Sequence, residues 1–235
     1  MHIHKNFWYN QRMEINNYIE HTILKPNLTQ NELVQFLDDA KKYNFKGVCI
    51  NPCHVAFCKE YLSGTNIKVV TVIGFPLGAN QSEVKAFEAQ QAIKAGADEV
   101  DMVINITALK EENYIYVKND IQEVVKASKD TPVKVILETD LITKEEIKIA
   151  CEMCVEAGAK FVKTSTGFVK DGFGAKAEDV KLMYDTVKDF GLEVKASGGM
   201  RTLEDAQAMI QAGATRLGTS AGVKIIEGLS SNGQY

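Results

Sequence analysis

The sequence predicts an α/β fold of the (β/α)8 TIM-barrel class, in which eight parallel strands alternate with helices around one closed barrel. Three observations lead to this prediction. Apolar strand-like runs alternate with amphipathic helical patterns almost to the end of the chain. The tripeptide Ala-Gly-Ala occurs three times between a helical pattern and a strand, where glycine ends the helix in a left-handed conformation. Eight candidate strands fit a closed barrel better than an open doubly wound sheet.

The predicted strands are short runs rich in β-branched and other apolar residues, as expected where both faces of a parallel sheet are covered. In chain order they cover residues 21–24, 47–50, 68–75, 98–104, 133–138, 160–164, 192–196 and 215–218. Between them apolar residues recur with helical spacing, and Thr29 is a suitable N-cap for the first helix. The predicted helices cover residues 30–42, 82–95, 114–129, 144–157, 177–190 and 203–212, and a final one begins at residue 223.

The chain can form one domain of this kind, because it has 235 residues, 45% of them hydrophobic, and no linker or low-complexity tract divides it. We therefore expect a single TIM-barrel domain over residues 1–235. Residues 1–12 are expected to form a short N-terminal helical extension outside the core. Residues 228–235 are expected to form a flexible tail.

Charge and hydropathy argue against two classes of partner. The 27 basic and 31 acidic residues give a net charge of -4 and form no basic tract, so no nucleic acid is expected to bind. No apolar run is long enough to span a membrane, and the first residues lack the apolar centre of a signal peptide. These features predict a cytoplasmic protein with no membrane partner.

The cysteines are odd in number and scattered through a chain that is too large to need disulfides, so free thiols are expected. They are Cys49, Cys53, Cys58, Cys151 and Cys154. The last two form a CxxC inside a helical pattern, where no second cysteine pair or histidine motif completes a zinc site, so no metal is expected. Cys49 lies in a predicted strand, which leaves core packing and a position at the barrel mouth both open.

Two lysines end the sixth and seventh predicted strands. Lys163 shares a strand face with Phe161, and burial of that face would remove hydration from the ammonium group and favour the neutral amine. A neutral lysine can attack a carbonyl and form a Schiff base. Lys195 ends the adjoining strand, and repulsion between two neighbouring ammonium groups favours loss of a proton from one of them. The alternative is that each lysine extends its charged end to solvent.

Asp101 lies inside the fourth predicted strand, where alternation places it on the same face as Glu99. A carboxylate that faces a barrel interior needs a partner, and Lys163 and Lys195 are available. Asp101 would then fix one ammonium group and exchange a proton with the other. An internal salt bridge that only stabilises the barrel is the alternative, and this segment alone does not separate the two.

Two glycine turns follow the last two predicted strands, at residues 197–199 and 218–222. Each turn precedes a helix and offers backbone N–H groups that no side chain obstructs. Barrels of this class often bind a phosphate group at these loops. The pair of turns therefore predicts phosphate binding, and Arg201 could add positive charge.

Eight segments along the chain carry a resemblance to a known family. They are EHTILKP (20–26), VCINP (48–52), TVIGFPLG (71–78), GADEVDMVINI (96–106), VILET (135–139), FVKTSTGF (161–168), ASGGMRT (196–202) and RLGTSAGVKI (216–225). Over about residues 15–226 the chain resembles the deoxyribose-phosphate aldolases, which are class I aldolases. The resemblance implies the (β/α)8 barrel, in agreement with the separate strand count.

The resemblance also implies a reaction: reversible cleavage of 2-deoxy-D-ribose 5-phosphate to acetaldehyde and D-glyceraldehyde 3-phosphate, through a lysine Schiff base and with no cofactor. The expected partner is this phosphosugar, and a homo-oligomer, either a dimer or a tetramer, is expected.

Three residues match the family's catalytic positions. Lys163 matches the lysine that forms the imine, and Lys195 matches the lysine that helps to keep that amine neutral and joins a proton relay. Asp101 matches the aspartate that donates or accepts a proton with an ordered water. The residues that match the family's phosphate-binding turns are Gly167, Gly198, Gly199, Gly218 and Ser220.

Five further residues are candidate accessory residues: Glu20, Cys49, Thr166, Arg201 and Tyr235. Glu20 stands where the family usually has an aspartate, which is one methylene shorter. Some members place a C-terminal tyrosine in the active site to assist proton transfer, and Tyr235 could do so or belong to a frayed tail. The loop at residues 168–175 is less glycine-rich near its start than the family pattern.

Two other functions remain open from the sequence. Another class I barrel aldolase, such as a transaldolase or a keto-acid phosphate aldolase, would share the lysine and the phosphate turns but use a different donor. A non-catalytic phosphosugar-binding barrel would keep the turns without turnover, although the intact Lys163, Lys195 and Asp101 argue against it.

Overall fold

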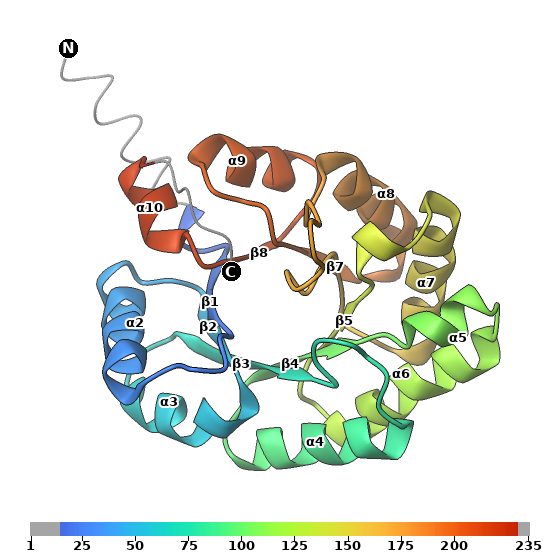
Figure 1. Ribbon diagram of the computed structural model, residues 1–235, viewed down its shortest axis with the longest axis horizontal. Helices are drawn as coiled ribbons and strands as arrows, with labels where there is room; N and C mark the ends of the chain where they lie inside the picture. Colours follow the sequence, from blue (N-terminus) through green and yellow to red (C-terminus); the bar gives the residue numbers. More distant parts are fainter. Residues whose placement is uncertain (1–14, 230–235) are drawn as a thin grey trace.

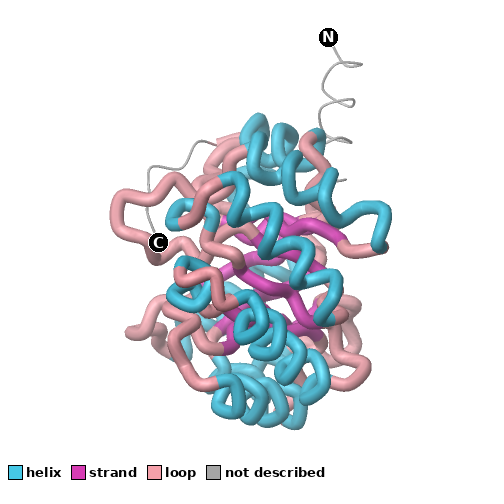
Figure 2. Tube along the Cα trace, turned by 90° about the vertical axis from the view of Figure 1, so that its right-hand side faces the viewer, coloured by secondary structure: helices cyan, strands magenta, loops and turns pink. Residues whose placement is uncertain are grey.

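The structure, a computed structural model, describes residues 15–229. They form a closed barrel of eight parallel strands that pair in chain order, with β8 returning to β1. Figure 1 shows the strands at the centre of a ring of helices, and Figure 2 shows the strands enclosed by helices in a second view. The strands are β1 (Ile19–Ile23), β2 (Gly47–Ile50), β3 (Lys68–Ile73), β4 (Glu99–Val103), β5 (Val133–Ile136), β6 (Phe161–Lys163), β7 (Glu193–Ser197) and β8 (Arg216–Thr219).

The helices lie outside the strands, as the alternating pattern predicted. They are α2 (Gln30–Lys42), α3 (Val55–Tyr61), α4 (Ser82–Lys94), α5 (Ile106–Lys110), α6 (Tyr114–Ser128), α7 (Lys144–Ala157), α8 (Ala177–Val187), α9 (Leu203–Gln211) and α10 (Gly222–Glu227). Short 3-10 turns are η1 (Pro52–His54), η2 (Thr139–Leu141) and η3 (Lys188–Phe190). The sequence did not predict α3 and α5, because an amphipathic pattern needs more than one or two turns to be recognised.

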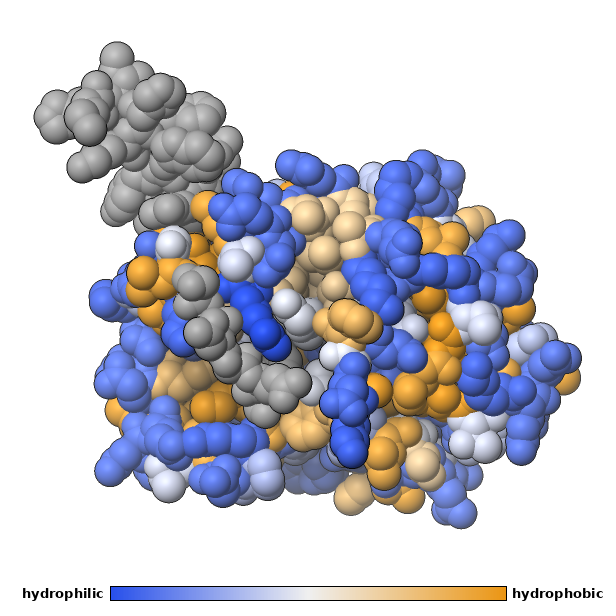
Figure 3. Space-filling model, turned by 45° about the horizontal axis from the view of Figure 1, so that its top comes forward, coloured by the Kyte–Doolittle hydropathy of each residue, from blue (hydrophilic) through white to orange (hydrophobic). Residues whose placement is uncertain are grey.

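The predicted barrel and its eight strands are confirmed. The expected N-terminal helical extension at residues 1–12 and Tyr235 lie outside the described residues, as does the expected tail beyond Leu229. Among residues 15–229, no helix combines the length and apolar character needed to cross a bilayer. On the face shown in Figure 3, hydrophilic residues lie between smaller hydrophobic areas.

Local sequence signals fix where several helices begin and end. Thr29, Thr143 and Thr202 each form a capping box, in which the threonine hydroxyl and an acidic side chain three residues later satisfy each other's backbone N–H groups. Each cap stabilises its helix by about 1 kcal/mol. Gly158 ends α7 in the left-handed conformation, at one of the three Ala-Gly-Ala junctions.

The interior of the barrel has an apolar side and a charged side. Leu24, Cys49, Val70 and Val72 form a buried apolar cluster near β1–β3. Ion pairs between side chains of β1 and β4–β8 fill the other side. Inward-facing residues of a barrel normally make a packed apolar core, so the charged side is the exception that needs a functional explanation.

Candidate functional site

The two lysines predicted from the sequence lie side by side, Lys163 at the carboxyl end of β6 and Lys195 in the middle of β7. Lys163 is the direct register partner of Lys195. The side chain of Lys163 is 4% exposed and that of Lys195 is fully buried. Both lie toward the carboxyl-terminal face of the barrel, where enzymes of this fold carry their chemistry.

Asp101 on β4 joins the two lysines. Its Oδ2 accepts hydrogen bonds from Lys163 Nζ at 2.8 Å and from Lys195 Nζ at 2.7 Å. Its Oδ1 accepts a hydrogen bond from Lys134 Nζ at 2.9 Å. Burial alone would raise the pKa of Asp101, but the three ammonium groups outweigh it and hold the pKa well below its ordinary value. Asp101 is therefore a carboxylate at neutral pH.

Lys195 has a second acidic partner, Glu20 of β1, whose carboxylate accepts a hydrogen bond from its Nζ. Burial would lower the pKa of Lys195, but Asp101 and Glu20 outweigh that effect and raise the pKa well above its ordinary value. Lys195 is therefore an ammonium ion. The lowering of the pKa that the sequence predicted for both lysines does not apply to Lys195, because β1 brings in an acid that the sequence argument did not count.

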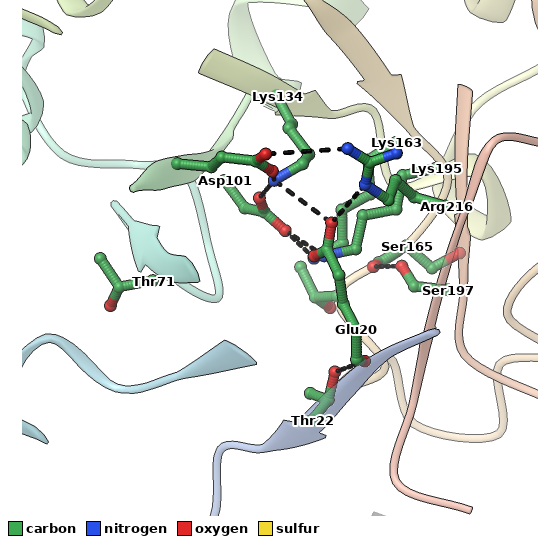
Figure 4. Close-up of polar contacts among 12 residues, drawn as sticks. Glu20, Thr22, Thr71, Asp101, Lys134, Lys163, Ser165, Lys195, Ser197 and Arg216 are labelled. Carbon is green, nitrogen blue, oxygen red and sulfur yellow. Dashed lines mark hydrogen bonds and ion pairs between the residues drawn. The ribbon is translucent and has the colours of Figure 1, made fainter. Parts of the chain in front are cut away.

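Three residues of this site were not predicted from the sequence: Lys134, Glu99 and Arg216. Lys134 Nζ lies 2.6 Å from Glu99 Oε2 and 3.5 Å from Glu20 Oε1. Burial would lower the pKa of Lys134, but the neighbouring carboxylates raise it. Arg216 Nε lies 3.5 Å from Glu20 Oε1. Figure 4 shows Lys134 between Asp101 and Glu20, with Arg216 on the other side of the Glu20 carboxylate.

These seven residues form what we call the charge cluster: Glu20, Glu99, Asp101, Lys134, Lys163, Lys195 and Arg216. It contains four basic groups and three acidic groups, so with all groups ionised it carries one surplus positive charge in a water-poor interior. Within the cluster, Lys163 pairs with one carboxylate, whereas Lys195 pairs with two. A neutral Lys163 balances the cluster at three charges of each sign.

A cavity of about 470 Å³ opens above these strands. Its walls come mainly from the loops after β6, β7 and β8, and they include four predicted phosphate residues, Gly167, Gly198, Gly199 and Ser220. Gly199 has φ 76°, and an added Cβ would lie 2.2 Å from the carbonyl oxygen of Phe173, so only glycine fits there. Gly218 lies apart from this lining, in β8, where an added Cβ would be 3.0 Å from Lys195 Cε. Its missing side chain makes room for that lysine.

The candidate accessory residues lie in different places. Glu20 belongs to the charge cluster, and Arg201 lies exposed in the cavity wall. Cys49 is buried in β2, where burial raises the pKa of its thiol. Thr166 contacts Glu138, a buried residue of the cavity wall that the sequence analysis did not single out. Within residues 15–229, no three His, Cys, Asp or Glu side chains are grouped so that they could hold a metal ion.

Comparison with known proteins identifies the family. A model described as "DeoC/LacD family aldolase" matches residues 17–228. The chain belongs to this aldolase family. It is 58% identical over 223 residues to the deoxyribose-phosphate aldolase of Staphylococcus carnosus (strain TM300), covering 95% of this chain and all of that protein. It is also 58% identical over 223 residues to that of Enterococcus faecalis (strain ATCC 700802 / V583), covering 94% of this chain and all of the relative.

Solved structures of family members show the same architecture. The putative deoxyribose-phosphate aldolase of Coccidioides immitis matches with a TM-score of 0.89 and 44% identity, over 92% of this chain and 85% of that one. The tetrameric deoxyribose phosphate aldolase of Aeropyrum pernix matches with a TM-score of 0.85 and 32% identity, over 92% and 91% of the two chains. The family resemblance found in the sequence motifs is confirmed.

Proposed function

We infer that this protein is a deoxyribose-phosphate aldolase, a lyase that reversibly cleaves 2-deoxy-D-ribose 5-phosphate to D-glyceraldehyde 3-phosphate and acetaldehyde. The names of its 58% identical relatives support this substrate. One structural observation carries the chemistry: Lys163 is a buried lysine in a charge cluster that balances when this amine is neutral. Its neighbours are an ionised carboxylate and a protonated lysine.

The first proposed step takes place at Lys163. Its neutral Nζ attacks the C1 aldehyde of the open-chain sugar and forms a carbinolamine, which loses water to give a protonated imine. This imine restores the positive charge that the neutral amine lacked. Asp101, whose Oδ2 lies 2.8 Å from Lys163 Nζ, stabilises that charge.

The second proposed step breaks the bond between C2 and C3 of the sugar. The C3 hydroxyl passes its proton to the Asp101 carboxylate and becomes the aldehyde of glyceraldehyde 3-phosphate, while the bonding electron pair moves into the imine and forms an enamine. The enamine carbon then takes up a proton, and water hydrolyses the resulting imine to acetaldehyde and free Lys163. Lys195 is placed to supply that proton and Asp101 to relay it, because their Nζ and Oδ2 atoms are 2.7 Å apart.

The cavity beside the lysines is proposed to bind the 5-phosphate. Its wall contains Ser165, two residues beyond Lys163, and the glycine turns of β6 and β7. Backbone N–H groups of such turns bind phosphate oxygens, and Arg201 in the same wall supplies positive charge. Fixing the phosphate there holds C1 of the substrate near the amine.

We further propose that the enzyme works in the cytoplasm as a homo-oligomer, either a dimer or a tetramer. All five cysteines are free thiols, which is usual in reducing compartments. The Aeropyrum pernix relative is described as a tetramer. Sedimentation or light scattering of the purified protein tests the oligomeric state.

Cleavage of 2-deoxy-D-ribose 5-phosphate, followed by a coupled assay for glyceraldehyde 3-phosphate, tests the proposed function. Lys163→Met is the matched variant, because methionine keeps most of the side-chain volume and removes the nucleophile. We expect turnover by the wild type and none above background by the variant. Equal turnover by both would contradict the role of Lys163. A wild type that cleaves a ketose phosphate or a keto-acid phosphate but not deoxyribose 5-phosphate would favour the other barrel aldolases.

A further inference from the structure

Glu138 follows β5 and is a buried residue to which the proposed reaction gives no role. It is 2% exposed and lines the cavity. Its backbone has φ 60° and ψ 64°, the left-handed conformation that residues other than glycine and asparagine rarely adopt. Such a conformation costs about 1 to 2 kcal/mol and persists at sites where the surrounding structure requires it.

The side chain of Glu138 holds the turn that follows Lys163. Its carboxylate accepts hydrogen bonds from the backbone N–H of Thr166, at 3.1 Å to Oε1 and 3.3 Å to Oε2, and from the Thr166 hydroxyl. The Thr166 hydroxyl oxygen in turn accepts a hydrogen bond from the backbone N–H of Phe168 at 3.0 Å. The N–H groups on both sides of Gly167 are thus occupied within the protein, and no described residue accepts from the N–H of Gly167 itself.

Asp140 holds the far end of the loop that follows Lys163 and β6. Its Oδ2 accepts a hydrogen bond from the backbone N–H of Gly174 at 2.7 Å. Gly174 packs directly on Gly198, since an added Cβ would lie 2.5 Å from the Gly198 carbonyl carbon. Ala175 N–H donates to the Gly198 carbonyl oxygen at 3.2 Å. The carboxylates of Glu138 and Asp140, both in the loop after β5, therefore fix the loop after β6 and its position against the turn after β7.

A carboxylate repels a phosphate group. Its presence in the wall of a phosphate site therefore needs a separate explanation. Burial raises the pKa of Glu138, although Thr166 and Lys163 act against the rise. The carboxyl oxygens of Glu138 accept hydrogen bonds from Thr166, so they hold the turn in place. The donor of this turn that is left for a ligand is the N–H of Gly167.

We propose that Glu138 is a positioning residue for phosphate recognition, which holds Thr166 so that the N–H of Gly167 points to the substrate phosphate. It thereby sets the preference for phosphorylated over phosphate-free deoxyribose. This inference rests on the proposed function, because it assigns the phosphate to this cavity.

Glu138→Gly tests the proposal, because glycine keeps the left-handed backbone and removes the carboxylate. We expect the ratio of kcat/KM for deoxyribose 5-phosphate to kcat/KM for deoxyribose to fall about tenfold, the equivalent of one good hydrogen bond, mainly through KM. Glu138→Gln retains an acceptor oxygen for Thr166 and should recover most of the ratio. Glu123→Gln, on the exposed surface of α6, is the control and should leave the ratio unchanged.

Calorimetric titration with inorganic phosphate separates this inference from the proposed function. We expect about tenfold weaker phosphate binding by Glu138→Gly than by the wild type. Equal losses for both sugars, or unchanged phosphate affinity, would overturn the positioning role. A wild type that cleaves neither sugar, but whose phosphate affinity still depends on Glu138, would sink the proposed function and leave the positioning role standing.

Discussion

The outer layer and the interior of the barrel both bury lysine beside aspartate, but the two regions balance their charges differently. Between α4 and α6, Lys85 Nζ lies 2.6 Å from Asp120 Oδ2, and both side chains are fully buried. Lys85 also donates to the carbonyl oxygen of Val103 at 3.0 Å, and Asp120 accepts from the Ser82 hydroxyl at 2.8 Å. This outer pair has one charge of each sign, whereas the charge cluster has four basic groups and three acidic ones.

The difference shows that burial alone does not identify a reactive lysine. Burial lowers the pKa of Lys85, although Asp120 acts against the fall. Lys85 nevertheless lies outside the barrel, where its side chain covers Gly74, with Cε 3.1 Å from an added Cβ. Lys163 instead lies at the end of a barrel strand, in a group with a surplus positive charge. Surplus charge and a position at the barrel mouth distinguish the proposed nucleophile from a structural lysine.

Among the changes to the surroundings of Lys163, removing the neighbouring cation should have the largest effect. In Lys195→Met the cluster is balanced only when Lys163 is charged, and the proposed proton donor is lost. We expect kcat for deoxyribose 5-phosphate to fall about 10³-fold, within the usual range for a general acid, with partial recovery as the pH is raised. Lys126→Met, an exposed change on α6, is the control. Near-normal kcat at neutral pH would show that the cluster does not need this charge.

The same substitution at the two buried lysines should separate stability from catalysis. Lys85→Met leaves Asp120 as a buried unpaired carboxylate and should lower the free energy of unfolding by about 3 to 5 kcal/mol. Lys163→Met leaves the cluster with three charges of each sign, as the neutral amine does, and should cost far less stability. Denaturant unfolding of both variants measures the contrast. A larger loss for Lys163→Met would contradict the charge count.

Removing both partners of the outer pair should restore much of that loss. In Lys85→Met with Asp120→Leu no buried charge is left unpaired, and apolar replacements of buried ion pairs are often neutral. We expect the double variant to recover about 2 to 3 kcal/mol relative to Lys85→Met alone. Unfolding titrations complete the double-mutant cycle. Strictly additive losses would show that the two residues do not act as a pair.

His21 provides the smallest expected effect, a dependence of stability on pH that comes from outside the charge cluster. Its ring stacks on Phe36 with 4.4 Å between centroids, and burial lowers its pKa to about 4, although a backbone hydrogen bond with Thr219 acts against the fall. The pKa of His21 is lower in the folded than in the unfolded state, so its neutral form contributes to the free energy of unfolding. That contribution is complete above about pH 6.5 and is lost as the pH falls toward 4. We expect about 2 kcal/mol less stability at pH 5 than at pH 7.

His21→Leu checks that assignment. Leucine cannot be protonated, so unfolding experiments between pH 7 and pH 5 should give a flatter stability profile for the variant than for the wild type. An equal slope in both proteins would assign the pH dependence to other groups.

Much of the fold was predictable because its signals are local. Thr29 and Thr143 carry their capping partners three residues away, and the glycine of each Ala-Gly-Ala ends a helix within the same short segment. Lys163, Lys195 and Asp101 could be placed together because strand order fixes which strand ends adjoin. A lysine inside an apolar strand was the useful signal, and Lys134 showed it too, but it lies near the start of its strand and not at the end.

The rest depends on contacts between distant segments. Glu20 changes the ionisation of Lys195 across 175 residues, because barrel closure places β1 next to β8. Glu138 accepts a hydrogen bond from Thr166 across 28 residues, and its backbone has a left-handed conformation that an ordinary glutamate does not predict. Sequence patterns therefore located the candidate reactive groups, whereas the charge states of Asp101 and Lys195 required the closed barrel.

Reduction with borohydride in the presence of acetaldehyde, followed by peptide mass analysis, tests the central claim most directly. A neutral Lys163 would form an imine that reduction converts to an N-ethyl group. We predict this modification at Lys163, with Lys195, Lys134 and Lys85 unmodified. Modification of Lys195 in place of Lys163, or of neither, would contradict the assignment of the nucleophile.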